Sequence, residues 1–189
     1  YGETLVEPKI LLPDNEACLR LPGIDGKAKM SKSLGNCIYL AEDPKDIKKK
    51  VMSMFTDPNN IRIEEPGSLE GNRVFTYLDA FCNDQHFEEY LPDYKNLDEL
   101  KEHYQRGGLG DVKVKKFLNN VLQEELEPIR KRREELQKDI PYVYEVLKKG
   151  SEAARETAAQ TLHEVRDAMK INYFDDAALI AEQSKKYNG

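Results

Sequence analysis

Apolar residues recur every three or four positions through most of the chain, a spacing typical of helices that bury one face. This pattern begins after Asp43, which is a good N-cap and is followed by Pro44. It is longest over residues 111–138, where we expect a single helix with a kink at Pro128. The apolar stripe predicted for this helix consists of Val114, Phe117, Leu118, Val121, Leu122 and Leu126.

Shorter helices are predicted on both sides of the long one. Their ends are marked by residues that favour helix ends, such as an asparagine N-cap at Asn72 or Asn96. We expect Gly150 to stop one helix and Ser151 to cap the next. The predicted segments are 43–55, 72–82, 85–90, 97–105, 141–149, 151–169 and 177–187.

The first forty residues have a different pattern, in which short apolar pieces are interrupted by prolines. Ala17–Leu21 and Ile38–Leu40 are the segments that favour short strands. Two or three short strands do not form a stable sheet alone. We therefore predict a mainly α fold, with a small α/β stub over residues 1–40 and a helical bundle over residues 41–189.

The composition limits the partners that the chain can attract. Of 189 residues, 29 are Lys or Arg and 35 are Asp or Glu, which gives a formal net charge of −6. Such a chain has no overall attraction for nucleic acid, so an RNA contact requires a local basic patch. Lysines and arginines do cluster over residues 113–116 and 130–133. They predict either a solvated helix face or a strip of phosphate contacts.

Other site classes have little support in the sequence. The three cysteines, Cys18, Cys37 and Cys82, are far apart and form no metal-binding motif, so we expect no metal site and a reducing cytoplasm. The three histidines also lack a ligand pattern. No apolar run is long enough for a membrane span. Tyr1 is not an initiator methionine, so we expect the chain to be cut from a longer one.

The most distinctive segment is Lys29–Ser33, with the letters KMSKS, between Gly26 and Gly35. Glycines at the two ends of a loop allow tight turns and a close approach to a ligand. Lysine ammonium groups suit phosphate oxygens, and small hydroxyls and backbone N–H groups add further donors. The segment therefore predicts a loop that binds polyphosphate.

The string KMSKS resembles the second signature of class I aminoacyl-tRNA synthetases. The resemblance extends to tryptophanyl-tRNA synthetases of the bacterial type through Leu21–Gly26, Thr56–Pro58, the Gly107–Gly110 turn with Lys115 after it, and Glu127–Arg130. It therefore covers nearly the whole chain. It implies that residues 1–40 end a Rossmann-like catalytic domain and that residues 41–189 form a helical domain that binds the tRNA anticodon region.

The resemblance also implies roles for individual residues. Lys29 and Lys32 are the expected catalytic residues, and they face the phosphates of ATP, which the family uses with Mg²⁺. The expected ATP-binding residues are Leu21, Lys29, Met30, Ser31, Lys32 and Ser33. For Leu21, a contact with adenine and simple core packing both stay open. Lys115, Arg130 and Arg133 are the expected contacts with tRNA(Trp).

The expected activity of the whole protein is activation of tryptophan with ATP and transfer of tryptophan to tRNA(Trp), by a homodimer in the cytoplasm. The family's first signature, His-Ile-Gly-His, and the tryptophan pocket do not occur in this sequence. We therefore expect this chain to be inactive alone. Two alternatives stay open: a tyrosyl-tRNA synthetase, which shares the architecture, and a stand-alone helical binding module.

Overall fold

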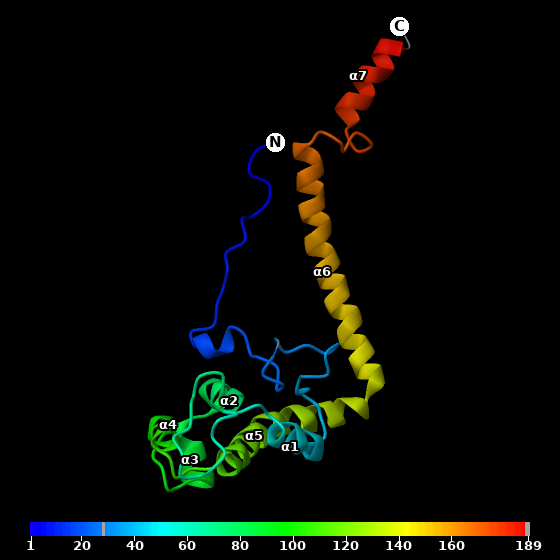
Figure 1. Cartoon of the computed structure of the whole chain (residues 1–189). Coiled ribbons are helices and arrows are strands. Elements are labelled where there is room, and N and C mark those ends of the chain that lie inside the picture. The colour runs from blue at the N-terminus through cyan, green and yellow to red at the C-terminus, as the bar shows by residue number, and fades with distance from the viewer. Residues whose placement is uncertain (28, 188–189) are drawn as a thin grey trace. The chain divides into compact units, whose positions relative to one another are not determined.

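A computed structural model describes residues 1–27 and 29–187, which are mainly helical (Figure 1). They divide into two compact units, residues 12–135 and residues 1–11 together with the segment from 136 onward. The elements are the 3-10 helix η1 (Glu16–Cys18) and the helices α1 (Pro44–Met52), α2 (Arg73–Phe81), α3 (Asp84–Tyr90), α4 (Leu97–Arg106), α5 (Asp111–Gln137), α6 (Ile140–Ala168) and α7 (Ala177–Tyr187). The predicted mainly α fold is confirmed.

The predicted helix starts at Asp43, Asn72 and Asn96 are confirmed by the capping contacts. The side chain of Asp43 accepts a hydrogen bond from Lys45 N, and that of Asn72 accepts one from Val74 N. Asn96 caps α4 in the same way. These bonds satisfy backbone donors that have no partner inside the helix.

The core of residues 12–135 forms around the first half of α5, with α1 to α4 beside it (Figure 1). All six residues of the predicted apolar stripe of α5 are buried. Phe117 of α5 packs against Phe87 of α3 with the ring centroids 4.6 Å apart. Ile47 and Val51 of α1 and Leu100 of α4 are also buried in this core.

The predicted break at Gly150 is wrong, because α6 runs without interruption from Ile140 to Ala168. A glycine inside a helix costs only about 1 kcal/mol relative to alanine, and no proline follows to enforce a stop. Ser151 is therefore an interior residue of α6 and not an N-cap. Among the described residues, α6 and α7 contain no buried side chain.

The expected strand at Ala17–Leu21 does not form. Its first residues belong to η1, where the Asn15 side chain accepts a hydrogen bond from Ala17 N at 3.0 Å. Within the described residues, β pairing is limited to one antiparallel bridge between Pro22 and Lys29. Pro22 has no backbone donor, so it cannot extend a ladder.

Residues 12–40 belong to the same compact unit as α1 to α4. The predicted boundary between residues 40 and 41 separates a catalytic domain from a helical domain in a longer protein. It stays a prediction.

Two leucines on different helices test where the stability resides. Leu118 on α5 is fully buried, whereas Leu147 on α6 is 60% exposed. Leu118→Ala should lower the free energy of unfolding by about 2–5 kcal/mol, because it leaves a cavity. Leu147→Ala should change it by about 0.5 kcal/mol or less. Urea denaturation followed by circular dichroism measures both, and equal losses would contradict this account of the core.

Candidate nucleotide-binding loop

The base of the KMSKS loop, residues 21–26, is fastened to the helical core. The hydroxyl of Tyr77, a residue that is 1% exposed, donates to Pro22 O at 2.8 Å. Phe55 N donates to Ile24 O at 3.0 Å, and Arg73 Nη2 donates to Gly26 O at 2.9 Å. Burial raises the pKa of Tyr77 to about 12, so this phenol remains a neutral donor at neutral pH. The loop therefore starts from a fixed position.

The two glycines at the ends of the loop have the conformation that the sequence predicts. Gly26 has φ +71° and Gly35 has φ +66°, values that residues with a Cβ rarely adopt. A Cβ at Gly26 would also lie 2.7 Å from the ring of Phe55. Gly35 N donates to Lys32 O at 3.2 Å and closes the turn.

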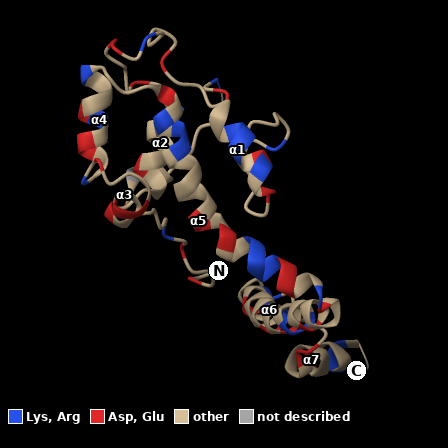
Figure 2. Cartoon of the chain, turned by 90° about the horizontal axis from the view of Figure 1, so that it is seen from below, with Lys and Arg blue, Asp and Glu red and all other residues tan. Residues whose placement is uncertain are grey.

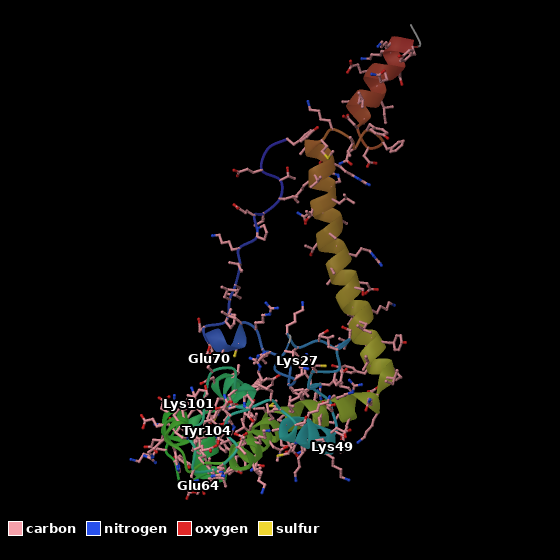
Figure 3. All side chains as sticks on the ribbon, viewed as in Figure 1. Lys27, Lys49, Glu64, Glu70, Lys101 and Tyr104 are labelled. Carbon is pink, nitrogen blue, oxygen red and sulfur yellow. The ribbon has the colours of Figure 1, made fainter. Side chains whose placement is uncertain are left out.

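The tip of the loop carries its charges at the surface. Lys29, Lys32 and Ser33 are exposed, and the hydroxyls of Ser31 and Ser33 are 2.9 Å apart. Within the part of the chain that the structure describes, the ammonium groups of Lys29 and Lys32 have no hydrogen-bond or ion-pair partner. They are therefore available to a ligand. Lys27, labelled in Figure 3, is also exposed.

A groove of about 830 Å³ lies beside the loop. Lys32 of the loop and Arg133 of α5 both line this groove. Met30 and Ser31 line it from the loop, and Ile129 lines it from α5. The remaining lining comes from residues 37–42. Met30 also packs against the hydrophobic core, in agreement with an anchoring role. Leu21 is half-buried, and its carbonyl accepts a hydrogen bond from Met30 N at 3.4 Å.

The three expected tRNA contacts are in different environments. Lys115 is half-buried and its Nζ donates to Met52 O, at the end of α1, at 3.2 Å; burial lowers its pKa. Arg130 reaches back along α5 to Gln123 Oε1 at 3.0 Å. Arg133 is exposed and has no side-chain partner among the described residues. Figure 2 shows Lys and Arg mixed with Asp and Glu along the second half of α5.

The Gly107–Gly110 turn and the Thr56–Pro58 segment lie beside a half-buried polar network. The hydroxyl of Tyr104, labelled in Figure 3, donates to Asp111 Oδ1 at 2.7 Å, and the Thr56 hydroxyl donates to the other carboxylate oxygen. Burial raises the pKa of Tyr104. A Cβ at Gly107 would lie 2.4 Å from Glu64 O, so only glycine fits. These motif residues join α4 to the start of α5.

The histidines have structural partners. His86 is buried, and its Nδ1 accepts a hydrogen bond from Asn83 N at 3.0 Å, which completes the cap of α3. The Nδ1 of His103 lies 2.7 Å from the Tyr94 hydroxyl. In the described ranges, no three His, Cys, Asp or Glu side chains gather to hold a metal ion. No helix of the described residues is long and apolar enough to cross a membrane.

Sequence reasoning missed the side chain that holds the loop together. Asn36, three residues after Ser33, is buried beneath the loop, and its amide contacts Asp25, Lys29 and Ser31. It also missed the anchoring roles of Arg73 and Tyr77. The available signal was the position of Asn36 directly after Gly35. A single asparagine at the end of a loop is too common to carry such an assignment.

Known proteins with similar sequences are tryptophan–tRNA ligases. One from Clostridium longisporum is 62% identical over 177 residues, which are 93% of this chain and 49% of that protein. One from Streptococcus agalactiae is 56% identical over 172 residues, which are 91% of this chain and 48% of that protein. The chain thus spans about half the length of these curated relatives.

Solved structures agree with this relationship. Tryptophanyl-tRNA synthetase from Campylobacter jejuni, crystallised with ADP and tryptophan, superposes with a TM-score of 0.62 at 26% identity, over 80% of this chain and 43% of that one. The resemblance to tryptophanyl-tRNA synthetases is therefore confirmed. The sequence model of the family described as tRNA synthetases class I (W and Y) matches residues 2–127. Since this match covers more than half of the chain, the chain belongs to the class I tRNA synthetases (W and Y).

Proposed function

We propose that this chain is the C-terminal part of a tryptophan–tRNA ligase. The whole enzyme activates tryptophan with ATP and then transfers it to tRNA(Trp). The observation that carries the proposal is the KMSKS loop: its base is fixed by Tyr77, Phe55 and Arg73, while Lys29 and Lys32 stand exposed at its tip. Relatives that match 93% and 91% of the chain are tryptophan–tRNA ligases, which supports the choice of amino acid.

In the activation step, the tryptophan carboxylate attacks the α-phosphorus of ATP. An oxygen–phosphorus bond forms to give tryptophanyl-adenylate, and the bond to the leaving pyrophosphate breaks. No general base is needed, because the attacking carboxylate is already ionised. Negative charge grows on the pyrophosphate, so positioned cations lower the barrier.

Lys29 and Lys32 supply those cations in our proposal. Ser31 and Ser33 add hydroxyl donors, and Ser33 adds its backbone N–H, since the Ser31 N–H already donates to Asn36 Oδ1 at 2.8 Å. Met30 and Leu21 lie on the side of the adenine. ATP enters with Mg²⁺, which neutralises part of the phosphate charge. The residues of the first family signature and the tryptophan pocket belong to the other half of the site, so we expect no activity from this chain by itself.

The helical part contributes the contact with tRNA(Trp). Arg133 is the best supported of the three candidates, because it is exposed and its guanidinium has no partner among the described residues. The side chains of Lys115 and Arg130 already donate to Met52 O and Gln123 Oε1, which favours an additional structural role for them. We further propose that the whole enzyme is a cytoplasmic homodimer, as the family implies.

The main alternative is ligation of tyrosine, since the family model covers both W and Y synthetases. The relatives described above favour tryptophan. ATP–pyrophosphate exchange by the whole enzyme with each amino acid distinguishes the two. A binding module without catalytic function would support exchange with neither.

The first test of this proposal is Lys32→Ala in the whole enzyme. The rate of adenylate formation should fall about 10²–10³-fold, as it does when one transition-state donor is removed. Tryptophan binding should stay near normal, because the contact forms mainly as the pyrophosphate charge grows. Pre-steady-state kinetics measure the rate. Lys27→Ala is the matched control, since Lys27 is exposed on the same loop. A normal rate with only weaker ATP binding would rule out the transition-state role of Lys32.

The second test concerns tRNA. If Arg133 contacts a phosphate, Arg133→Ala should weaken tRNA(Trp) binding at low salt and reduce the slope of log K against log salt by roughly one unit. Filter binding across a salt series measures this slope. Arg132→Ala on the same helix is the control, because Arg132 is paired with Glu135 at 3.1 Å. Equal slopes for Arg133→Ala and the unmodified enzyme would show that Arg133 is a solvated surface residue that makes no phosphate contact.

A further inference from the structure

We propose that Asn36 is the positioning residue of the KMSKS loop, which sets the places of Lys29 and Lys32 before a polyphosphate arrives. This inference rests on the proposed function of the loop. It adds a residue outside the five letters of the signature, and it gives that residue a role separate from binding the nucleotide.

The contacts of Asn36 link the fixed base of the loop to its exposed tip. Its side chain is 3% exposed, and its Oδ1 accepts a hydrogen bond from Ser31 N at 2.8 Å. Its Nδ2 lies 3.2 Å from Asp25 Oδ1 and 3.3 Å from Lys29 O. Its backbone carbonyl accepts from Ile24 N at 3.0 Å. A single residue thus holds both peptide groups that flank Met30.

The chemistry of this position requires an amide. One atom must accept from the Ser31 N–H while the neighbouring atom donates to Lys29 O and to the carboxylate of Asp25. An aspartate would keep the acceptor but lose the donor. It would also place a second carboxylate next to that of Asp25, where like charges repel.

The neighbouring Gly23 provides the space that the amide occupies. A Cβ built at Gly23 would lie 2.1 Å from Asn36 Nδ2 and 2.6 Å from Asn36 Cγ. An alanine at this position must therefore push the amide away. Gly23→Ala is for this reason a second way to disturb Asn36 without removing it.

The functional consequence follows from how the loop is attached to the core. Tyr77 and Arg73 hydrogen-bond to the base of the loop, and Asn36 connects that base to the tip. A reacting or stabilising group that is displaced by about 1 Å can lose about 10²-fold in rate. Loss of Asn36 should therefore act on the rate of activation through the two lysines.

The kinetic test uses the whole enzyme. Asn36→Ala should slow adenylate formation by roughly 10- to 100-fold while tryptophan binding stays normal. Gly23→Ala should have a similar effect. Asn119→Ala is the matched control, because Asn119 is a half-buried asparagine of α5 whose side chain contacts Asn120 and Gln123 of the same helix. In a Lys32→Ala background, Asn36→Ala should lower the rate by a smaller factor than in the unmodified enzyme, because part of its effect acts through Lys32. A normal rate for Asn36→Ala, or losses that multiply fully in the double variant, would overturn the proposal.

A digestion test examines the structural role of Asn36 separately from the catalytic function of the loop. Trypsin cleaves after lysine, so cleavage after Lys29 and Lys32, followed by mass spectrometry, reports how firmly the tip is held. Asn36→Ala and Gly23→Ala should speed this cleavage while the thermal midpoint of the core stays the same. Unchanged cleavage overturns the role of Asn36. If Lys32→Ala leaves activation normal, the proposed catalytic role of Lys32 fails, whatever the digestion shows.

Discussion

Burial of the apolar face of α5 is the constraint on which residues 12–135 depend. The short helices α1 to α4 contain seven to ten residues each, too few to be stable in isolation. They persist because their apolar residues share one core with Val114 to Leu126. The same core fixes Tyr77 and Arg73, which hold the base of the KMSKS loop. The position of the exposed lysines is thus set by hydrophobic packing several elements away.

Polar contacts then direct this packing to one arrangement. The Asp111 carboxylate joins Thr56 and Tyr104 at the first turn of α5, and Lys115 reaches the end of α1 one turn later. These hydrogen bonds are part-buried, and a polar group removed from water without a partner is costly. A shift of α1 along α5 would break the contact of Lys115, and a shift of α4 would break that between Tyr104 and Asp111. Thr56 and Lys115, two motif residues outside the KMSKS loop, therefore help to hold the helices in register.

Features determined by local chemistry were predictable from the sequence. Asp43, Asn72 and Asn96 cap their helices as expected, and the stripe from Val114 to Leu126 is buried. Features determined by distant contacts were not. Gly150 was expected to end a helix because its propensity is low, yet one unfavourable residue does not interrupt a helix of 29 residues. The role of Asn36 depends on where Asp25 and Ser31 lie in space, and no short motif encodes that.

The unbroken course of α6 has a consequence for how this part of the chain can vary. Each residue of an α-helix advances the axis by about 1.5 Å and turns it by about 100°. Substitutions on its exposed surface leave that geometry intact. A single inserted or deleted residue would instead rotate the two ends of the helix relative to each other by more than a quarter of a turn. An insertion or deletion thus changes the geometry of α6 more than a substitution of most of its exposed side chains.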